Sequence, residues 1–156
     1  MKVSDILRVK GGGTLYTVVP HEHLGTAVKT MADCDIGSLL VMEHGRLIGM
    51  LSFREVIAAV AKNGGNVDDT AVHQVMDRQP VTCSPHTDVD EVRRLMLAQH
   101  ARYMPVLDGD TLMGVISFYD VAKAVVEGQD FENRMLRAYI SDCPVEDGIA
   151  EEGKAR

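Results

Sequence analysis

The stretch Gly49-Met-Leu-Ser-Phe-Arg-Glu55 occurs a second time, 65 positions later, as Gly114-Val-Ile-Ser-Phe-Tyr-Asp120. At the same shift, residues 17–60 align with residues 82–125 without a gap. Self-similarity at a fixed period is typical of a repeated structural unit whose copies pack together, because one copy alone cannot bury its apolar face. We therefore expect an internally duplicated fold in which two copies share their apolar faces.

Each copy shows the same order of local patterns. A short extended segment closed by proline precedes an amphipathic helix, then two strands joined by a glycine-containing turn, then a second helix. The predicted strands are 16–19, 38–42 and 47–51 in the first copy, and 81–84, 103–107 and 112–116 in the second. Helices are predicted near Leu24, at Phe53, after the N-cap residue Asp88, and at Phe118. The unit is β-α-β-β-α, so the fold class is α/β.

The boundaries between the copies follow from composition. A lead-in of similar pattern recurs at residues 3–7 and 72–76, and a stretch rich in glycine, asparagine and aspartate separates the copies. The segment from Asp130 has apolar residues at helical spacing, which predicts one more helix before a polar tail. The predicted segments are repeat 1 at 1–62, a linker at 63–71, repeat 2 at 72–127, and a C-terminal helix with a flexible tail at 128–156.

Composition limits the classes of partner. The 156 residues carry a formal charge of −7, and no cluster of lysine and arginine indicates a nucleic-acid partner. No uninterrupted apolar run reaches the roughly 18 residues of a membrane span, so we expect no membrane association. Residues 1–7 mix charged and apolar side chains and lack the apolar region of a signal peptide, which predicts a cytoplasmic protein.

Cysteine and histidine spacing predicts no metal site. The three cysteines, Cys34, Cys83 and Cys143, are odd in number and widely spaced, which suits neither a disulfide framework nor a zinc site. The repeated His21 and His86 each follow a proline and are interpreted as turn residues rather than metal ligands.

The duplicated unit resembles a tandem pair of CBS domains, called a Bateman module. The resemblance is based on the Gly-apolar-apolar-Ser-x-x-Asp/Glu signature in both copies and on the segment Arg-Tyr-Met-Pro-Val at 102–106. The compact length is similar to that of the free-standing bacterial members, which have no attached enzyme. The resemblance implies two repeats packed about a pseudo-two-fold axis, with two clefts that accept AMP, ADP, ATP, NAD or S-adenosylmethionine. It also implies pairing of modules into a homodimer.

The start of the second helix in repeat 2 is chemically suited to a nucleotide. The first N–H groups of a helix lack intrahelical partners and attract anions, so a phosphate can bind where the strand ends at Ser117. The Ser117 hydroxyl can add a hydrogen bond, and the Asp120 carboxylate can accept two from a ribose diol. By resemblance, Ser117 and Asp120 carry these roles.

A purely structural interpretation of the same residues stays open. Ser-x-x-Glu at a helix start is also a capping box, in which the serine and the acid satisfy backbone amides. Glu55 has the length for this box, whereas the shorter Asp120 is expected to close it less well and to remain freer for a ligand.

The resemblance, combined with the differences between the copies, gives two candidate clefts. The preferred one is expected to contain Thr82, Cys83, Arg102, Tyr103, Met104, Pro105, Ser117 and Asp120. The second is expected to contain Thr17, Ser38, Leu39, Ser52, Arg54 and Glu55. Arg54 in the first turn of a helix opposes the helix dipole, a conflict that an anionic ligand would remove. A solvated surface arginine explains the same residue.

Three functions are compared. A non-catalytic sensor, with an adenine nucleotide as regulatory ligand and an unidentified protein as possible partner, agrees best with the residues. A dimerisation or adaptor scaffold with vestigial clefts is the alternative. A hydrolase using Ser117 with His86 or His100 and Asp120 is disfavoured, because Ser117 lacks the following glycine of a nucleophile elbow. In addition, Ser117 and Asp120 are three residues apart at one helix start, which leaves no place for a histidine between them. No catalytic residues are therefore assigned.

Overall fold

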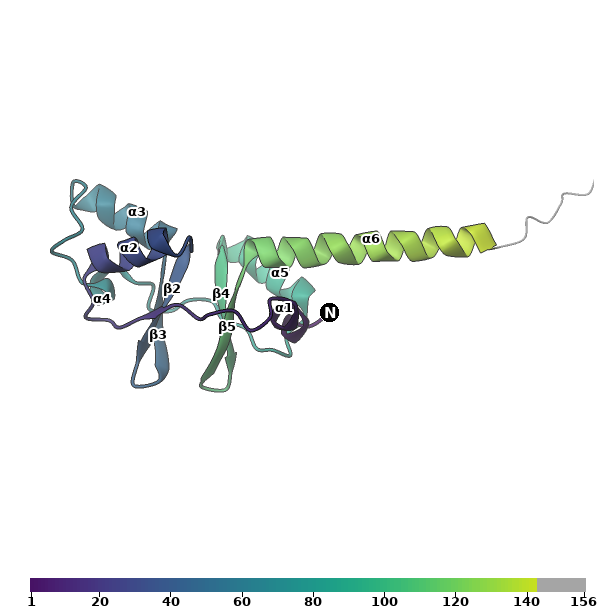
Figure 1. The fold of residues 1–156 in the computed structure, drawn as a ribbon, viewed down its shortest axis with the longest axis horizontal. Helices are drawn as coiled ribbons and strands as arrows, with labels where there is room; N and C mark the ends of the chain where they lie inside the picture. Colours follow the sequence, from purple (N-terminus) through teal and green to yellow (C-terminus); the bar gives the residue numbers. More distant parts are fainter. Residues whose placement is uncertain (143–156) are drawn as a thin grey trace, which may run out of the picture.

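The computed structural model describes residues 1–142 of the chain (Figure 1). The elements in chain order are α1 (Val3–Val9), β1 (Thr17–Val18), α2 (Leu24–Asp33), β2 (Ser38–Glu43), β3 (Arg46–Ser52), α3 (Phe53–Lys62), α4 (Val72–Val75), α5 (Val89–Gln99), β4 (Tyr103–Asp108), β5 (Thr111–Ser117) and α6 (Phe118–Asp142). We call α2, α3 and β1–β3 the first half, and α5, α6, β4 and β5 the second half. The expected α/β class and the duplicated order of elements are confirmed.

The two halves differ in the length of their first strand. In the first half, β1 pairs in parallel with β2, which forms an antiparallel hairpin with β3. In the second half, the strand predicted at 81–84 is reduced to a single bridge between Cys83 and Val106, beside the β4–β5 hairpin. The Leu40 N–H donates to the Tyr16 carbonyl at 3.2 Å, but Pro105 stands at the equivalent position and has no N–H. The parallel pairing beside β4 is therefore shorter than that between β1 and β2.

Each half completes its core with the lead-in helix of the other repeat. Val3 and Ile6 of α1 are buried in the core of the second half, and α1 contacts α6 and β5. Val72 of α4 is buried in the core of the first half, where α4 contacts α3 and β3. Figure 1 shows α1 on the side of the second half and α4 on the side of the first half. The predicted repeat boundaries at 1–62 and 72–127 follow the sequence. Each packed half, in contrast, contains the lead-in helix of the other repeat.

Backbone hydrogen bonds hold both lead-ins in the same way. The Val3 N–H donates to the Thr87 carbonyl at 3.0 Å, and the Val72 N–H donates to the Glu22 carbonyl at 2.9 Å. Asp88 is the N-cap residue of α5, as expected, but its side chain makes no capping hydrogen bond and pairs with Lys2 Nζ at 2.9 Å. The hydrogen bond and the charge of Lys2 lower the pKa of this exposed carboxyl. The two hydrogen bonds from Val3 and Val72 are equivalent, because the donors and the acceptors occupy matching positions of the two repeats.

The glycine of the repeated signature has a packing role in this exchange. A Cβ at Gly114 would approach Leu7 Cδ2 at 2.9 Å, and a Cβ at Gly49 would approach Met76 Sδ at 2.6 Å. Leu7 and Met76 are equivalent residues of the two lead-ins. The absence of a Cβ therefore lets each lead-in lie directly on a strand of the other half, with the closer approach at Gly49.

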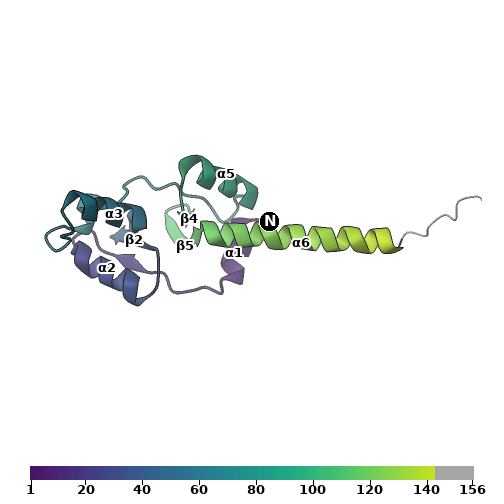
Figure 2. The same cartoon turned by 90° about the horizontal axis from the view of Figure 1, so that it is seen from above.

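The last helix is longer than expected. The sequence predicts a helix at Phe118 and a separate one from Asp130, but α6 runs continuously through both, since the polar residues between them include no proline. Figure 2 shows its outer part projecting away from both halves. Every side chain from Asp130 to Ile140 is exposed. The predicted flexible tail beyond 142 lies outside the described residues.

None of the helices in residues 1–142 has both the length and the apolar character needed to cross a membrane.

We predict that Gly49→Ala destabilises the protein more than Gly114→Ala. The new methyl at Gly114 meets only the flexible end of Leu7, whereas at Gly49 it also meets the Asp77 backbone oxygen at 2.9 Å. Overpacking costs about 1–3 kcal/mol, and we expect Gly49→Ala to fall in that range. Urea unfolding of both variants measures the difference in unfolding free energy. Equal losses would show that backbone crowding at Gly49 does not matter.

Candidate functional site

Two cavities lie between the halves, and each joins the strand-to-helix turn of one half to the other half. The first, the Ser117 cleft, has a volume of about 670 Å³. Its lining comes from the loops of the first half, from the segment after α1, and from the start of α6. The lining residues are Lys10, Gly13, Thr14, Tyr16, Asp35, Ile36, Gly37, Ser38, Arg102, Tyr103, Val115, Ser117, Phe118, Tyr119 and Asp120.

The second cavity, the Ser52 cleft, has a volume of about 490 Å³. It joins the start of α3 to the segment after α4 and to the end of α5. The lining residues are Met50, Ser52, Phe53, Arg54, Glu55, Ile57, Ala58, Asp77, Gln79, Val81, Gln99, His100, Ala101, Arg102 and Tyr103.

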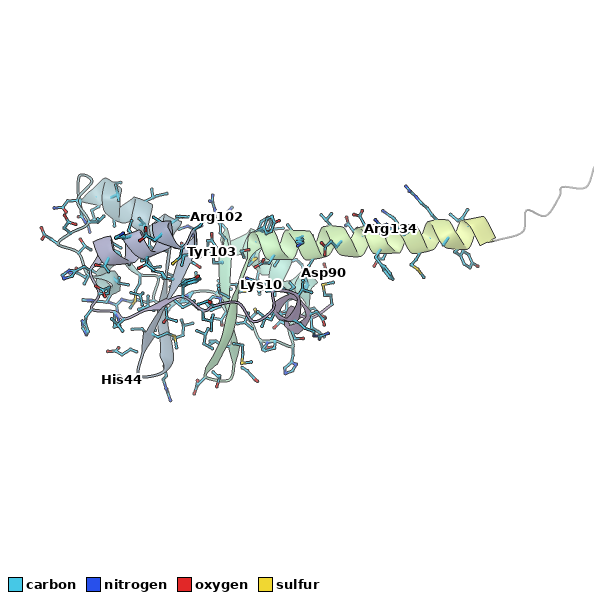
Figure 3. All side chains as sticks on the ribbon, in the orientation of Figure 1. Lys10, His44, Asp90, Arg102, Tyr103 and Arg134 are labelled. Atoms are coloured by element: carbon cyan, nitrogen blue, oxygen red, sulfur yellow. The ribbon has the colours of Figure 1, made fainter. Side chains whose placement is uncertain are left out.

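Arg102 and Tyr103 line both clefts. Figure 3 shows the two side chains near the middle of the molecule, between the halves. A Cβ built at Gly37 would overlap the Tyr103 hydroxyl and would lie 2.8 Å from Phe53 Cε2. The Tyr103 ring of the second half therefore lies directly on the backbone of the first half. Gly37 is required there because of this close approach.

The structure redistributes the residues that the sequence assigned to the clefts. Ser117, Asp120, Arg102 and Tyr103 come together as expected, but Ser38, assigned to the second cleft, lines the Ser117 cleft with them. Grouping by repeat misplaced Ser38 because the strand that it begins faces the helix start of the other half.

The second cleft keeps only part of its expected set. Ser52, Arg54 and Glu55 line the Ser52 cleft together. Leu39 is buried in the core of the first half, and Thr17 is exposed on β1. The Ser52 cleft includes neither of them among the residues that the structure describes.

Several residues expected in the preferred cleft lie elsewhere. Cys83, Met104 and Pro105 are buried, and Thr82 is exposed. Within residues 1–142, none of these four lines either cleft. Burial raises the pKa of the Cys83 thiol to about 11, so this sulfur stays protonated at neutral pH. Cys83 and Met104 belong to the core of the second half, and Met104 and Pro105 lie in β4.

Asp120 closes the capping box, contrary to the expectation that its short side chain would leave it free. The Ser117 N–H donates to Asp120 Oδ2 at 2.8 Å, and the Asp120 N–H donates to Ser117 Oγ at 3.1 Å. In the first half, Glu55 Oε2 accepts from both the Ser52 N–H, at 2.8 Å, and the Ser52 hydroxyl. The box forms with Asp because the turn brings Asp120 back over the Ser117 amide.

Asp120 also pairs with a residue that the sequence analysis did not assign. Lys10 Nζ lies 2.8 Å from Asp120 Oδ2 and donates to the Val115 carbonyl at 3.0 Å. Burial alone would raise the pKa of Asp120, but the hydrogen bonds from Lys10 and the Ser117 amide outweigh burial and lower it. The carboxylate is therefore ionised, and its Oδ2 oxygen accepts from both Lys10 and the Ser117 amide.

The helix starts offer fewer free amides than expected. The Phe118 N–H donates to the Arg102 carbonyl at 2.8 Å, and the Phe53 N–H donates to the Gly37 carbonyl at 3.3 Å. Two of the first three N–H groups of α6, those of Phe118 and Asp120, thus already have acceptors. An anion in the Ser117 cleft would depend on cationic side chains more than on the helix start.

Arg54 has a structural partner. Its guanidinium donates to the carbonyl of His100, the C-cap residue of α5. A cation at the C-terminal end of a helix is favourable, which offsets its position in the first turn of α3. An anionic ligand is therefore not needed to explain Arg54.

Lining residues from the other half were missed by the sequence analysis. Tyr16, Asp35 and Gly37 line the Ser117 cleft, and Gln79 and His100 line the Ser52 cleft. No local motif marks them. The signal for Lys10 was its place directly after the first lead-in, at the start of a Lys-Gly-Gly-Gly stretch.

In the part of the chain from 1 to 142, no group of three histidine, cysteine, aspartate or glutamate residues could hold a metal ion.

Comparisons with known proteins agree on one family. The family model for the CBS domain matches residues 3–62 and 72–127. The CBS domain-containing protein CBSX3, mitochondrial, of Arabidopsis thaliana is 28% identical over 88% of this chain and 71% of its own length. A CBS-domain-containing protein from Agrobacterium tumefaciens is 30% identical, with a TM-score of 0.75 over 80% of this chain and 98% of that one. CBSX2, solved in complex with AMP, shares the fold at 21% identity, with a TM-score of 0.67 over 82% of this chain and 98% of its own.

We predict that Gly37→Ala displaces the Tyr103 ring and destabilises the protein by about 1–3 kcal/mol, the usual cost of overpacking. The combined variant Gly37→Ala/Tyr103→Ser should recover much of the loss, because serine occupies the equivalent position, Ser38, in the first half. Urea unfolding of the two variants and of Tyr103→Ser alone measures this coupling. Purely additive losses would contradict the contact.

Proposed function

This chain belongs to the CBS-domain family, and on that premise we propose that it is a regulatory module that binds an adenine nucleotide between its halves. The observation that carries the proposal is the Ser117 cleft. It brings the signature residues Ser117 and Asp120 of one half against Tyr16 and Gly37 of the other, with Arg102 between them. A ligand there contacts both halves at once. Its binding would therefore favour one relative orientation of the halves.

The chemistry of the Ser117 cleft is suited to the parts of a nucleotide. The Asp120 carboxylate can accept hydrogen bonds from a ribose diol. The exposed Arg102 guanidinium can pair with phosphate, and Tyr16 and Tyr103 offer aromatic faces for a base. Candidate ligands are AMP, ADP, ATP, NAD and S-adenosylmethionine. CBSX2, which was solved with AMP, supports a nucleotide for this fold.

The Ser52 cleft is proposed as a second and different site. Arg54 and Arg102 line it beside the carboxylates of Glu55 and Asp77, and the two guanidinium groups are the ones that an anionic ligand would contact. Glu55 is held by Ser52 in a capping box, as Asp120 is held by Ser117, but this cleft is smaller, about 490 Å³ against about 670 Å³. We therefore expect weaker nucleotide binding in this cleft.

We propose that the module is not a catalyst. Among the described residues, the lining of the Ser117 cleft includes no histidine, and His100 lines the other cleft. Ser117 Oγ accepts a hydrogen bond from the Asp120 N–H, and Asp120 pairs with Lys10. Ser117 therefore has no general base in place, which argues against the hydrolase hypothesis.

Self-association is a second proposed property, carried by the outer part of α6. Isolated helices are marginal in water, and a helix is stabilised chiefly by burying an apolar face. The exposed apolar side chains on this part are Phe131, Met135, Leu136, Tyr139 and Ile140. A surface of this kind indicates a protein partner.

The charges on α6 favour a second copy of this chain as that partner. Acidic Glu127, Asp130 and Glu132 are followed by basic Arg134 and Arg137. Two copies packed antiparallel would place the acidic part of each helix beside the basic part of the other. We therefore propose an antiparallel homodimer through α6, compatible with a scaffold role.

We predict that calorimetric titration detects binding of at least one nucleotide among AMP, ATP, NAD and S-adenosylmethionine. Asp120→Asn, which keeps the size of the side chain, should weaken that binding about tenfold or more because it removes a charged acceptor. Asp110→Asn is the matched control, since Asp110 lies in the β4–β5 turn, at the end of the hairpin away from Ser117. No heat with any nucleotide would refute the proposed function.

We predict that the double variant Phe131→Asp/Tyr139→Asp lowers the molecular mass in sedimentation equilibrium to that of a monomer. Charges placed in the apolar helix face would oppose its burial between two copies. Leu97→Asp, at an exposed apolar residue of α5, is the control and should retain the dimer. A wild-type monomer, or a dimer in the double variant, would contradict pairing through α6.

A further inference from the structure

Lys10 links the lead-in helix to the Ser117 cleft. It is the C-cap residue of α1, and its ammonium contacts Asp120 Oδ2 at 2.8 Å and the Val115 carbonyl at 3.0 Å. The Lys10 side chain is 38% exposed, whereas that of Asp120 is 16% exposed. Figure 3 shows Lys10 next to the second half. Lys10 can thus be reached by a ligand while it holds the carboxylate.

The pairing occupies the carboxylate that a ribose would need. Asp120 Oδ2 already accepts from both Lys10 and the Ser117 N–H. A nucleoside that approaches this oxygen must therefore compete with an ammonium group. An ammonium that leaves a carboxylate without meeting another anion loses a charge-assisted hydrogen bond, which is among the stronger polar contacts in proteins.

The charged side chains that line the cleft are balanced. Within residues 1–142, the cations of its lining are Lys10 and Arg102, and the carboxylates are Asp35 and Asp120. A phosphate adds negative charge to this balanced set. Lys10 is the cation already inside the cleft beside the ribose-binding carboxylate, so it is the group that a phosphate can draw away from Asp120.

The other cleft supplies an internal comparison. At the shift of 69 that relates the two lead-ins, Lys10 corresponds to Gln79, which lines the Ser52 cleft. Glutamine carries no charge and forms no ion pair. Each cleft therefore receives a side chain from the segment that follows a lead-in, and this side chain is a cation in the Ser117 cleft and an uncharged amide in the Ser52 cleft.

We propose that Lys10 is the specificity-determining residue of the Ser117 cleft, selecting phosphorylated nucleotides over uncharged nucleosides. In the empty cleft Lys10 neutralises Asp120. A ligand phosphate takes over the ammonium, and Asp120 becomes available to the ribose diol. An uncharged nucleoside offers no such exchange and has to break the pair. This proposal depends on the proposed nucleotide function and adds the chemical class that the cleft selects.

The test compares AMP with adenosine by calorimetric titration of wild type and Lys10→Gln, the substitution that copies Gln79. We expect the wild type to prefer AMP. In Lys10→Gln the preference for AMP over adenosine should fall about tenfold or more, because AMP loses a charge-assisted contact while adenosine no longer competes with an ammonium. A merely structural role of Lys10 would weaken both ligands in parallel.

Lys2→Gln is the matched control. Lys2 also belongs to the lead-in, but it pairs with Asp88 outside both clefts, so this variant should keep the wild-type preference. An unchanged ratio in Lys10→Gln, with binding intact, would overturn the role of Lys10 alone. Absence of binding by the wild type to both ligands would overturn the proposed function and this proposal with it. Thermal unfolding followed by circular dichroism verifies that each variant is folded.

Discussion

The fold depends on an exchange of helices between its halves. Val3 and Ile6 complete the core of the second half, and Val72 completes the core of the first. Burying one such side chain contributes about 1.5–3 kcal/mol, a large fraction of the stability of a small domain. Each half therefore needs a segment that the chain attaches to the other. Gly49 and Gly114 serve this exchange, since a Cβ at either position would meet the crossing lead-in, at its backbone beside Gly49 and at the flexible end of Leu7 beside Gly114.

The same exchange builds the clefts. After α1 packs on the second half, the chain must return to the first, and it passes the start of α6 at Lys10. After α4 packs on the first half, the chain returns to the second and passes the start of α3 at Gln79. A lead-in is thus both a core element and the source of a cleft side chain. Packing and the proposed ligand selection are consequently coupled in one segment.

The two clefts share a scaffold and differ in chemistry. Equivalent positions hold Ser38 and Tyr103, whose side chains differ in size. Because Tyr103 reaches across onto the backbone of Gly37, it lines both clefts and breaks the symmetry between them. Lys10 beside Asp120 further distinguishes the Ser117 cleft electrostatically. An internally duplicated chain can in this way respond to two ligands, or to one ligand at two sites of unequal affinity.

The sequence by itself determined the duplication, the order of the elements, and the helix starts at Ser52 and Ser117, because these are recorded in local periodicity and in residues a few positions apart. It did not determine which copy contributes to which cleft. The contact of Lys10 with Asp120 spans 110 positions, and the contact of Gly37 with Tyr103 also joins the two copies. Asp120 appeared free from its length alone, yet its carboxylate accepts from the nearby Ser117 amide and, because the fold brings α1 to this point, from the Lys10 ammonium. Such contacts depend on the crossing of the lead-ins, which only the tertiary structure decides, since a repeat specifies a unit but not the partner that completes it.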